Sequence, residues 1–437
     1  MSIKKPSKIL AGALQRYENP KTTVLDFFGG LGVSFVMPGM TLFALLSVLA
    51  CNETNMCKPT SLAELSWSFF KENTQTRAFV LPFVVYHGWL LWLVALYFIL
   101  PADKVSGTTL RNGTKLLYPV NGNALVSYAL LASMYGHYGR RPFIWIADNT
   151  LGLVVSSFLV ATMQAILLYM LSFRAQVMLS VVGNSGNPIY DFFIGRELNP
   201  RIFGLDLKYF CELRPGIIGW TVLNICFAVK QYHSFGYITN SMWIVIISQI
   251  LYALDSLWFE SAVLTTMDIT TEGFGWMLSM GDLCWLPAVY TIQARYLSFT
   301  PIVLSDVYCF FIAAMSVCSY LVFRLSNSQK NNFRSNPNSK ISRNNKYLET
   351  KAGSKLLISG WWGLARHINY TGDWFLGLSQ CLATGFGTPY TYFFSAYFLA
   401  LLLHRNARDE HKCMQKYGND WDKYCSIVKY KFIPYIY

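Results

Sequence analysis

Residues 78–100 read AFVLPFVVYHGWLLWLVALYFIL, an apolar run that contains no acidic residue, lysine or arginine. A helix of about 20 mostly apolar residues is long enough to cross the hydrocarbon core of a bilayer. We therefore predict a transmembrane helix here. Further runs of the same kind are found at residues 25–50, 151–173, 217–229, 242–259, 307–325 and 390–403. Shorter or more polar candidates lie at residues 124–138, 274–290 and 374–384.

The composition agrees with these runs. Of 437 residues, 53% are hydrophobic and only 14% are charged, whereas about a quarter of the residues of a soluble globular protein are charged. A large soluble helical protein would not contain so many uncharged runs in succession. The prediction is an all-α, polytopic integral membrane protein with about ten transmembrane helices.

The positive charge is unevenly distributed. The formal net charge is +13, and lysines and arginines gather in residues 1–23, in residues 326–355 and after residue 403. Loops rich in Lys and Arg stay in the cytosol, so both termini and the long basic loop are expected there. We divide the chain into a cytosolic tail (1–23), a transmembrane body (24–325), a basic cytosolic loop (326–355) and C-terminal helices (356–437). The tail has no apolar core and is not a cleaved signal. A nucleic-acid partner is not needed to explain the charge.

Most of the ten cysteines lie in or beside apolar runs and are expected to be small buried hydrophobic residues. Cys51 and Cys57 differ, since they lie in a predicted lumenal loop where a disulfide could form. Asn52-Glu53-Thr54 in the same loop matches a glycosylation acceptor.

Carboxylates within the apolar body are candidates for chemistry, because ionisable groups are costly in a membrane and are usually functional. The candidates are Glu260, Asp268 and Asp282. Alternatively, such groups cap helix ends or pair with arginines such as Arg295. We expect at least one of them to line a functional cavity.

Two segments of the C-terminal part combine cations, carboxylates and aromatic rings. Residues 401–424 read LLLHRNARDEHKCMQKYGNDWDKY, and Gly418 is a natural helix stop. The last membrane helix is thus predicted to leave the bilayer and expose a cationic stripe. Residues 355–374, KLLISGWWGLARHINYTGDW, form the second segment. Basic residues at helix ends also reach for lipid phosphates, but this does not explain the interleaved Asp409 or the aromatic residues.

Together the two segments suit a nucleotide with phosphates, ribose hydroxyls and rings. The chain has no Gly-rich dinucleotide fingerprint after a strand and no P-loop, so such a site would be built from helices. His404, His411 and Cys413 lack the paired spacing of a zinc site, and we expect no metal.

Two long motifs resemble the signatures of the sterol reductase family. These are GNPIYDFFIGRELNPR at 186–201 and LLHRNARDEHKCMQKYG at 402–418. The family includes Δ14-sterol reductases, 7-dehydrocholesterol reductases and the membrane domain of the lamin B receptor. The similarity covers nearly the whole chain, and MDITTEGFGWML, which begins at Met267, is most similar to the fungal C14 enzymes.

The resemblance implies an NADPH pocket on the cytosolic side of the C-terminal helices. By motif, its positions are Lys330, Arg334, Leu357, Trp362, Asn369, Tyr370, Asp409, Cys413, Met414, Gln415, Lys416, Tyr417 and Tyr424. We add Arg405, which is expected to orient the cofactor. The transmembrane body would hold the sterol cavity.

The resemblance also implies a place in the endoplasmic reticulum membrane. There the chain would meet its sterol substrate, membrane lipid and other sterol-biosynthesis enzymes.

The implied reaction is reduction of the C14=C15 bond of Δ8,14-sterols in ergosterol biosynthesis. An acid protonates C15 and a hydride from NADPH is added at C14. Burial in an apolar cavity favours a protonated carboxyl, so Asp282, Glu260 and Asp268 are the candidate proton donors.

Three alternatives stay open. One is a C7 reductase of the same family. Another is an isoprenylcysteine-type methyltransferase that uses S-adenosylmethionine, whose R-H-x-x-Y pattern RHINY satisfies. The third is a sterol-binding or transport protein without activity.

Overall fold

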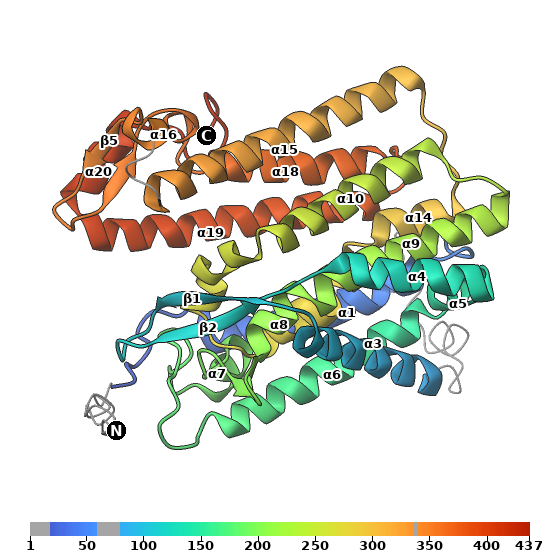
Figure 1. The fold of residues 1–437 in the computed structure, drawn as a ribbon, viewed down its shortest axis with the longest axis horizontal. Coiled ribbons are helices and arrows are strands. Elements are labelled where there is room, and N and C mark those ends of the chain that lie inside the picture. The colour runs from blue at the N-terminus through green and yellow to red at the C-terminus, as the bar shows by residue number, and fades with distance from the viewer. Residues whose placement is uncertain (1–17, 59–78, 336–339) are drawn as a thin grey trace, which may run out of the picture. The chain divides into compact units, whose positions relative to one another are not determined.

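A computed structural model describes residues 18–58, 79–335 and 340–437. Most of these residues are helical (Figure 1). They form two compact units. Of the described residues, unit 1 contains 18–48, 79–223 and 252–288, and unit 2 contains 49–58, 224–251, 289–335 and 340–437. Most of the predicted N-terminal tail and residues 336–339 of the predicted basic loop lie outside the described residues.

Five helices of the described part are long and apolar enough to cross a membrane. They are α1 (Gly29–Ala50), α3 (Val80–Ile99), α6 (Thr150–Leu171), α10 (Asn240–Trp258) and α15 (Asp306–Ser335). Each coincides with one of the long apolar runs, so the prediction of a membrane protein with several spans is confirmed. Helix α15 continues ten residues beyond its apolar part, because Ser326 to Ser335 contain neither glycine nor proline.

The other predicted spans are also helical. They correspond to α4 (Ala124–Tyr138), α9 (Pro215–Phe235), α18 (Ile368–Leu382) and α19 (Phe393–Tyr417). The candidate at 274–290 is a broken helix made of α12 (Trp276–Met280), a π-helical turn (Gly281–Trp285) and α13 (Leu286–Val289). Helix α19 runs without a break from apolar into charged sequence and ends at Gly418, whose φ is +51°. This confirms the predicted exit of the last long helix into polar sequence.

Unit 1 contains short elements between its long helices. The hairpin of β1 (Asp103–Thr109) and β2 (Lys115–Val120) pairs Asp103 with Val120 and turns at Asn112-Gly113, a strong hairpin signal. The others are α5 (Arg141–Asp148), α7 (Pro188–Ile194), β3 (Arg201–Ile202), β4 (Leu205–Asp206), α8 (Leu207–Leu213), the 3₁₀ helix η4 (Glu260–Thr265) and α11 (Met267–Thr270). The all-α prediction did not include the hairpins, which lie outside the five long apolar helices.

In unit 2, α15, α18 and α19 run side by side (Figure 1). Small elements gather at the end of this bundle where α15 and α19 become polar, near the C-terminus. They are α16 (Lys340–Arg343), β5 (Tyr347–Glu349), β6 (Lys355–Leu357), α17 (Trp361–Leu364) and α20 (Asn419–Ile427). Helix α14 (Ile292–Phe299) and the 3₁₀ helix η6 (Tyr390–Tyr392) complete the unit.

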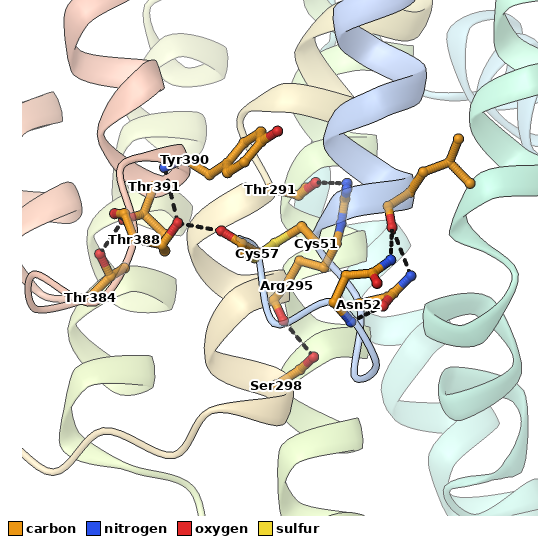
Figure 2. Close-up of a disulfide and its surroundings, with 12 residues drawn as sticks. Cys51, Asn52, Cys57, Thr291, Arg295, Ser298, Thr384, Thr388, Tyr390 and Thr391 are labelled. Carbon is orange, nitrogen blue, oxygen red and sulfur yellow. Dashed lines mark hydrogen bonds between the residues drawn. A yellow bond between two sulfur atoms is a disulfide. The ribbon is translucent and has the colours of Figure 1, made fainter. Parts of the chain in front are cut away.

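The structure pairs Cys51 with Cys57 in a disulfide, as the sequence allowed (Figure 2). The hydroxyl of Thr388 donates a hydrogen bond to the carbonyl of Cys57, which ties the small loop to the segment before η6. Within the loop, the carboxamide oxygen of Asn52 accepts hydrogen bonds from the amides of Thr54 and Asn55. Its nitrogen, the atom that a glycan would occupy, donates to the carbonyl of Leu49 at 2.8 Å.

Candidate functional site

The first signature lies in unit 1, where it packs against the MDITTEGFG segment backbone to backbone. A Cβ atom on Gly273 or Gly275 would collide with the backbone of Gly195. Gly195 itself has a φ of +92°, a conformation that favours glycine. The amide of Phe274 donates to the carbonyl of Glu197 at 3.0 Å. The glycines of the two motifs are therefore needed for this close contact.

A buried lysine supports the same segment from the other side. The Lys208 ammonium is 0% exposed and donates to the carbonyls of Asp268 (2.6 Å), Ile269 (3.1 Å) and Glu272 (2.7 Å). An ammonium has three protons, and each has an acceptor here. Burial lowers the pKa of Lys208 to about 8. Lys208 thus holds α11 and Glu272 in place, and its ammonium has no proton left to donate to a ligand.

Glu260, one of the three candidate acids, is fully engaged. One carboxylate oxygen accepts from the Tyr209 hydroxyl at 2.6 Å and from the Arg214 guanidinium at 2.7 Å. The other accepts from the amide of Gly122 at 2.6 Å. Glu260 and Arg214 are both almost completely buried. Glu260 therefore has the arginine partner that we considered as an alternative, although the partner is Arg214 rather than Arg295.

Asp282 has different surroundings. It lies in the π-helical turn, where a helix is locally widened, a feature frequently found at functional sites. Its Oδ2 atom is buried and has no hydrogen-bond partner within the described part of the chain. The carbonyl of Asp282 is approached by Gly216 at the start of α9, where a Cβ atom would not fit. Asp268 is 7% exposed, and its carbonyl is one of the three that bind Lys208.

The second signature and the 355–374 segment meet in unit 2. The Lys330 ammonium on α15 lies 3.9 Å from the centre of the Trp362 ring on α17, a cation–π distance. The indole of Trp362 donates to the carbonyl of Ser326 at 2.8 Å. Leu357 of β6 packs with Trp362 and Phe333 in one buried cluster. Three of the predicted pocket residues are therefore neighbours, although they come from three elements.

Helices α18 and α19 add further predicted residues to this end of the unit. Asp409 interacts electrostatically with Lys330, and its carboxylate is 43% exposed. The Cys413 thiol lies 3.9 Å from the same carboxylate, and burial raises the pKa of this thiol to about 12. Asn369 donates to the Asn327 side chain at 3.3 Å, while its own Oδ1 atom is buried without a partner among the described residues.

The remaining predicted residues are divided between a second cluster and the exposed surface. Tyr417 stacks on Trp421, and the ring centroids of Trp421 and Tyr424 are 5.1 Å apart. Burial raises the pKa of Tyr424 above its ordinary range. Arg405 lies on α19, four residues before Asp409. The exposed residues are Arg334, Met414, Gln415 and Lys416.

An ion-pair cluster fastens the segment before α18 to residues 428–432. The Arg366 guanidinium donates to Glu410 at 2.8 Å and to the carbonyl of Val428 at 2.9 Å. Lys431 completes the cluster, 3.1 Å from the other oxygen of Glu410. His367 follows Arg366, and its backbone amide donates to the carbonyl of Lys431. These contacts fix the start of α18, where Asn369 and Tyr370 are found.

A hollow of about 510 Å³ lies between α15 and α17. None of the residues predicted to bind the cofactor lines it. Its lining consists of Leu325, Ser328, Gln329, Asn332, Gly360, Trp361 and Leu364.

Two residues with strong contacts were not among the predicted site residues. Lys208 is the single cation of LKYFCEL between two motifs, a signal that could have marked it as a buried hydrogen-bond donor. His367 precedes the selected pair Asn369 and Tyr370 in RHINY, but its contact with Asp409 joins residues 42 positions apart in the chain. Sequence spacing could not reveal that contact.

Comparison with known proteins agrees with the resemblance. Delta(14)-sterol reductase erg24 of Schizosaccharomyces pombe is 45% identical over 416 residues, which is 94% of this chain and 97% of that protein. Delta(14)-sterol reductase ERG24 of Candida albicans is 42% identical, covering 96% and 99% of the two chains. Delta(14)-sterol reductase TM7SF2 of Mus musculus is 41% identical, covering 94% and 98%. Residues 21–437 match the family described as "Ergosterol biosynthesis ERG4/ERG24 family", and the chain belongs to this family.

Proposed function

We propose that this protein is a Δ14-sterol reductase that uses NADPH to reduce the C14=C15 bond of Δ8,14-sterols in ergosterol biosynthesis. The names of its full-length fungal relatives support the reaction. One structural observation carries the cofactor assignment. Predicted pocket residues meet at one end of unit 2. They come from α15, α17, α18, α19 and β6 and lie up to 83 positions apart in the chain (Lys330 to Cys413).

The chemistry of this cluster suits a dinucleotide. Lys330 and the exposed Arg334 would bind the 2′-phosphate that distinguishes NADPH from NADH. Asp409 would accept hydrogen bonds from ribose hydroxyls, and Trp362 would hold the Lys330 ammonium in place beside them. The buried Oδ1 atom of Asn369, which has no partner in the part of the chain that the structure describes, is an acceptor that a bound amide or hydroxyl would satisfy. NADPH would supply the hydride that C14 receives.

For the proton, Asp282 is the best of the three candidates. Both oxygens of Glu260 are already engaged by Arg214, Tyr209 and the amide of Gly122, whereas Asp282 keeps a buried oxygen without a protein partner in the described residues. A carboxyl in such surroundings would donate its proton to C15 and be left as a carboxylate, which solvent then reprotonates. The resulting cation at C14 would be allylic to the C8=C9 bond of the sterol, and water would have to be kept from it until the hydride arrives.

The proposed location is the endoplasmic reticulum membrane, with both termini and the nucleotide pocket on the cytosolic side. The five long helices together with α4, α9, α18, α19 and the broken helix at 276–289 would make about ten crossings. Sterol and membrane lipid would be the contacts of this body. The alternative of a methyltransferase gains no support, since the relatives named above are all Delta(14)-sterol reductases.

The cofactor assignment is tested with Arg334→Ala. We expect its KM for NADPH to rise about 10- to 100-fold while its KM for NADH stays unchanged, because a charge-assisted hydrogen bond contributes about 1.5–3 kcal/mol. The measurement is turnover of a Δ8,14-sterol by detergent-solubilised enzyme with each cofactor. Arg343→Ala, which also removes an exposed arginine of unit 2, is the control. An equal loss with both cofactors would contradict the assignment of Arg334.

The acid assignment is tested with Asp282→Asn, which keeps the shape of the side chain but removes the proton. Turnover of the Δ8,14-sterol should fall by about 10² to 10⁴ without loss of folded protein. Asp103→Asn, at an exposed position of β1, serves as the control. Near-normal turnover of a folded Asp282→Asn enzyme would eliminate Asp282 and pass the role to Asp268.

A further inference from the structure

His367 lies beside Asp409 and Tyr370, two of the residues predicted to bind the nucleotide, although the family resemblance gave it no role. Its ring stacks on Tyr370 with centroids 4.7 Å apart and an interplanar angle of 19°. Its Nε2 atom lies 3.4 Å from Oδ2 of Asp409, and its side chain is 9% exposed. A single buried ring therefore contacts two residues that are expected to touch the cofactor.

The charges around His367 determine its protonation state. Burial, with the nearby cations Lys330 and Arg366, lowers the pKa of His367 to about 3. The imidazole is therefore neutral at physiological pH and carries one proton. A carboxylate oxygen of Asp409 lies 3.4 Å from Nε2, so the tautomer that carries its proton on Nε2 directs a donor toward Asp409.

His367 is one of the groups near the Asp409 carboxylate, together with Lys330 and Cys413. Asp409 lies on a helix face and is 43% exposed, and the Cys413 thiol at 3.9 Å is only a weak donor. Arg366 is already bonded to Glu410 and to the carbonyl of Val428. His367 itself is held by the bond from its amide to the carbonyl of Lys431, at 2.9 Å. A fixed imidazole thus places a donor beside a carboxylate that is partly exposed.

We propose that His367 is a positioning residue, which donates a hydrogen bond to Asp409 and stacks on Tyr370 so that both are pre-oriented for the nucleotide. This role rests on the proposed function, because it requires that Asp409 bind the cofactor. Pre-orientation lowers the cost of binding without changing the chemical step. Its loss should therefore be seen in the KM for NADPH and not in kcat.

The test uses the enzyme in detergent, four variants at positions 367 and 409, and one control variant. His367→Phe keeps a stacking ring but removes the donor, and His367→Gln keeps a donor at the position of Nε2. His367→Asn, which is too short to reach Asp409, provides a second loss variant if the phenylalanine variant does not accumulate. Asp409→Asn removes the charge that His367 orients. His233→Phe, at an exposed position of unit 2, is the matched control.

We expect His367→Phe and His367→Asn to raise the KM for NADPH about tenfold, the order expected for a hydrogen bond to a charged group, with kcat within about twofold. His367→Gln should recover most of the affinity. Combined with Asp409→Asn, the loss variants should add little further increase, because the two residues act through one contact.

Two results would overturn the role of His367 alone. The first is a raised KM in Asp409→Asn with an unchanged KM in His367→Phe and His367→Asn. The second is an equal and additive loss in all three His367 variants together with a lowered melting temperature, which describes a packing residue. If Asp409→Asn leaves the KM for NADPH unchanged, the nucleotide site itself is wrong and the role of His367 fails with it.

Discussion

The two signature motifs are both charged, but the structure uses their charges in different ways. Near the first motif two buried charges are matched by protein groups, since Lys208 binds three carbonyls and Glu260 binds Tyr209, Arg214 and the amide of Gly122. Around the second motif Asp409 is 43% exposed and Arg334 is exposed. A charged motif can therefore either hold a fold together or present a surface to a ligand.

This comparison makes a general prediction. Substitutions in the first region should lower the stability of the protein, and substitutions in the second should weaken cofactor binding in a protein that stays folded. Two experiments change the first region, and a third, with the smallest expected effect, probes the second.

The largest effect is expected for Lys208→Met. The change leaves three buried carbonyls without their donor, and each costs about 1–3 kcal/mol. Because a whole domain is stable by only about 5–15 kcal/mol, we expect little or no folded protein. Yield after detergent extraction and size-exclusion chromatography provides the measurement, with Lys115→Met at an exposed strand position as the control. Recovery of Lys208→Met with an unchanged melting temperature would show that this region is not held together as we infer.

Glu260→Gln should have the next largest effect. It keeps the shape of the side chain but leaves the guanidinium of Arg214 buried without a counter-charge, a loss of about 3–5 kcal/mol. We expect a large drop in melting temperature and in yield. A variant that folds normally but has lost sterol turnover would break the comparison, because it would give Glu260 the catalytic role that we assign to Asp282.

The smallest effect concerns pH and lies in the second region. His367 has a pKa of about 3 in the folded protein and an ordinary value of about 6.5 when unfolded. The unfolded chain therefore binds more protons between these values, so the stability that the neutral ring contributes is complete above pH 6.5 and is lost as the pH falls. From pH 7.5 to 5.5 the loss is about 1.4 kcal/mol.

The measurement compares the melting temperatures of wild type and His367→Gln across that pH range. Other groups titrate in both proteins, so the change in their difference reports on residue 367. A constant difference between pH 7.5 and 5.5 would mean that the folded protein accommodates a protonated ring at this position.

The sequence predicted most of the membrane architecture, because hydropathy is a local property. The runs at 78–100 and 151–173 became α3 and α6 with ends within two residues of the prediction. The exit of α19 into polar sequence was also foreseen from the change in composition after residue 403 and from Gly418. The hairpin of β1 and β2 was not predicted, although Asn112-Gly113 is a turn signal, because the strands are short and only partly apolar.

The candidate site residues also divide into those that the sequence could select and those that only the tertiary structure could rank. Composition and resemblance by themselves selected the nucleotide residues, because cations, a carboxylate and rings gather within two short segments of the chain. They could not rank Glu260, Asp268 and Asp282, which look alike in sequence. Only the tertiary structure distinguished them: it paired Glu260 with Arg214, which is 46 positions away, and left Asp282 in a π-helical turn. Which buried charge is neutralised depends on contacts between distant segments, and a linear pattern of residues does not contain those distances.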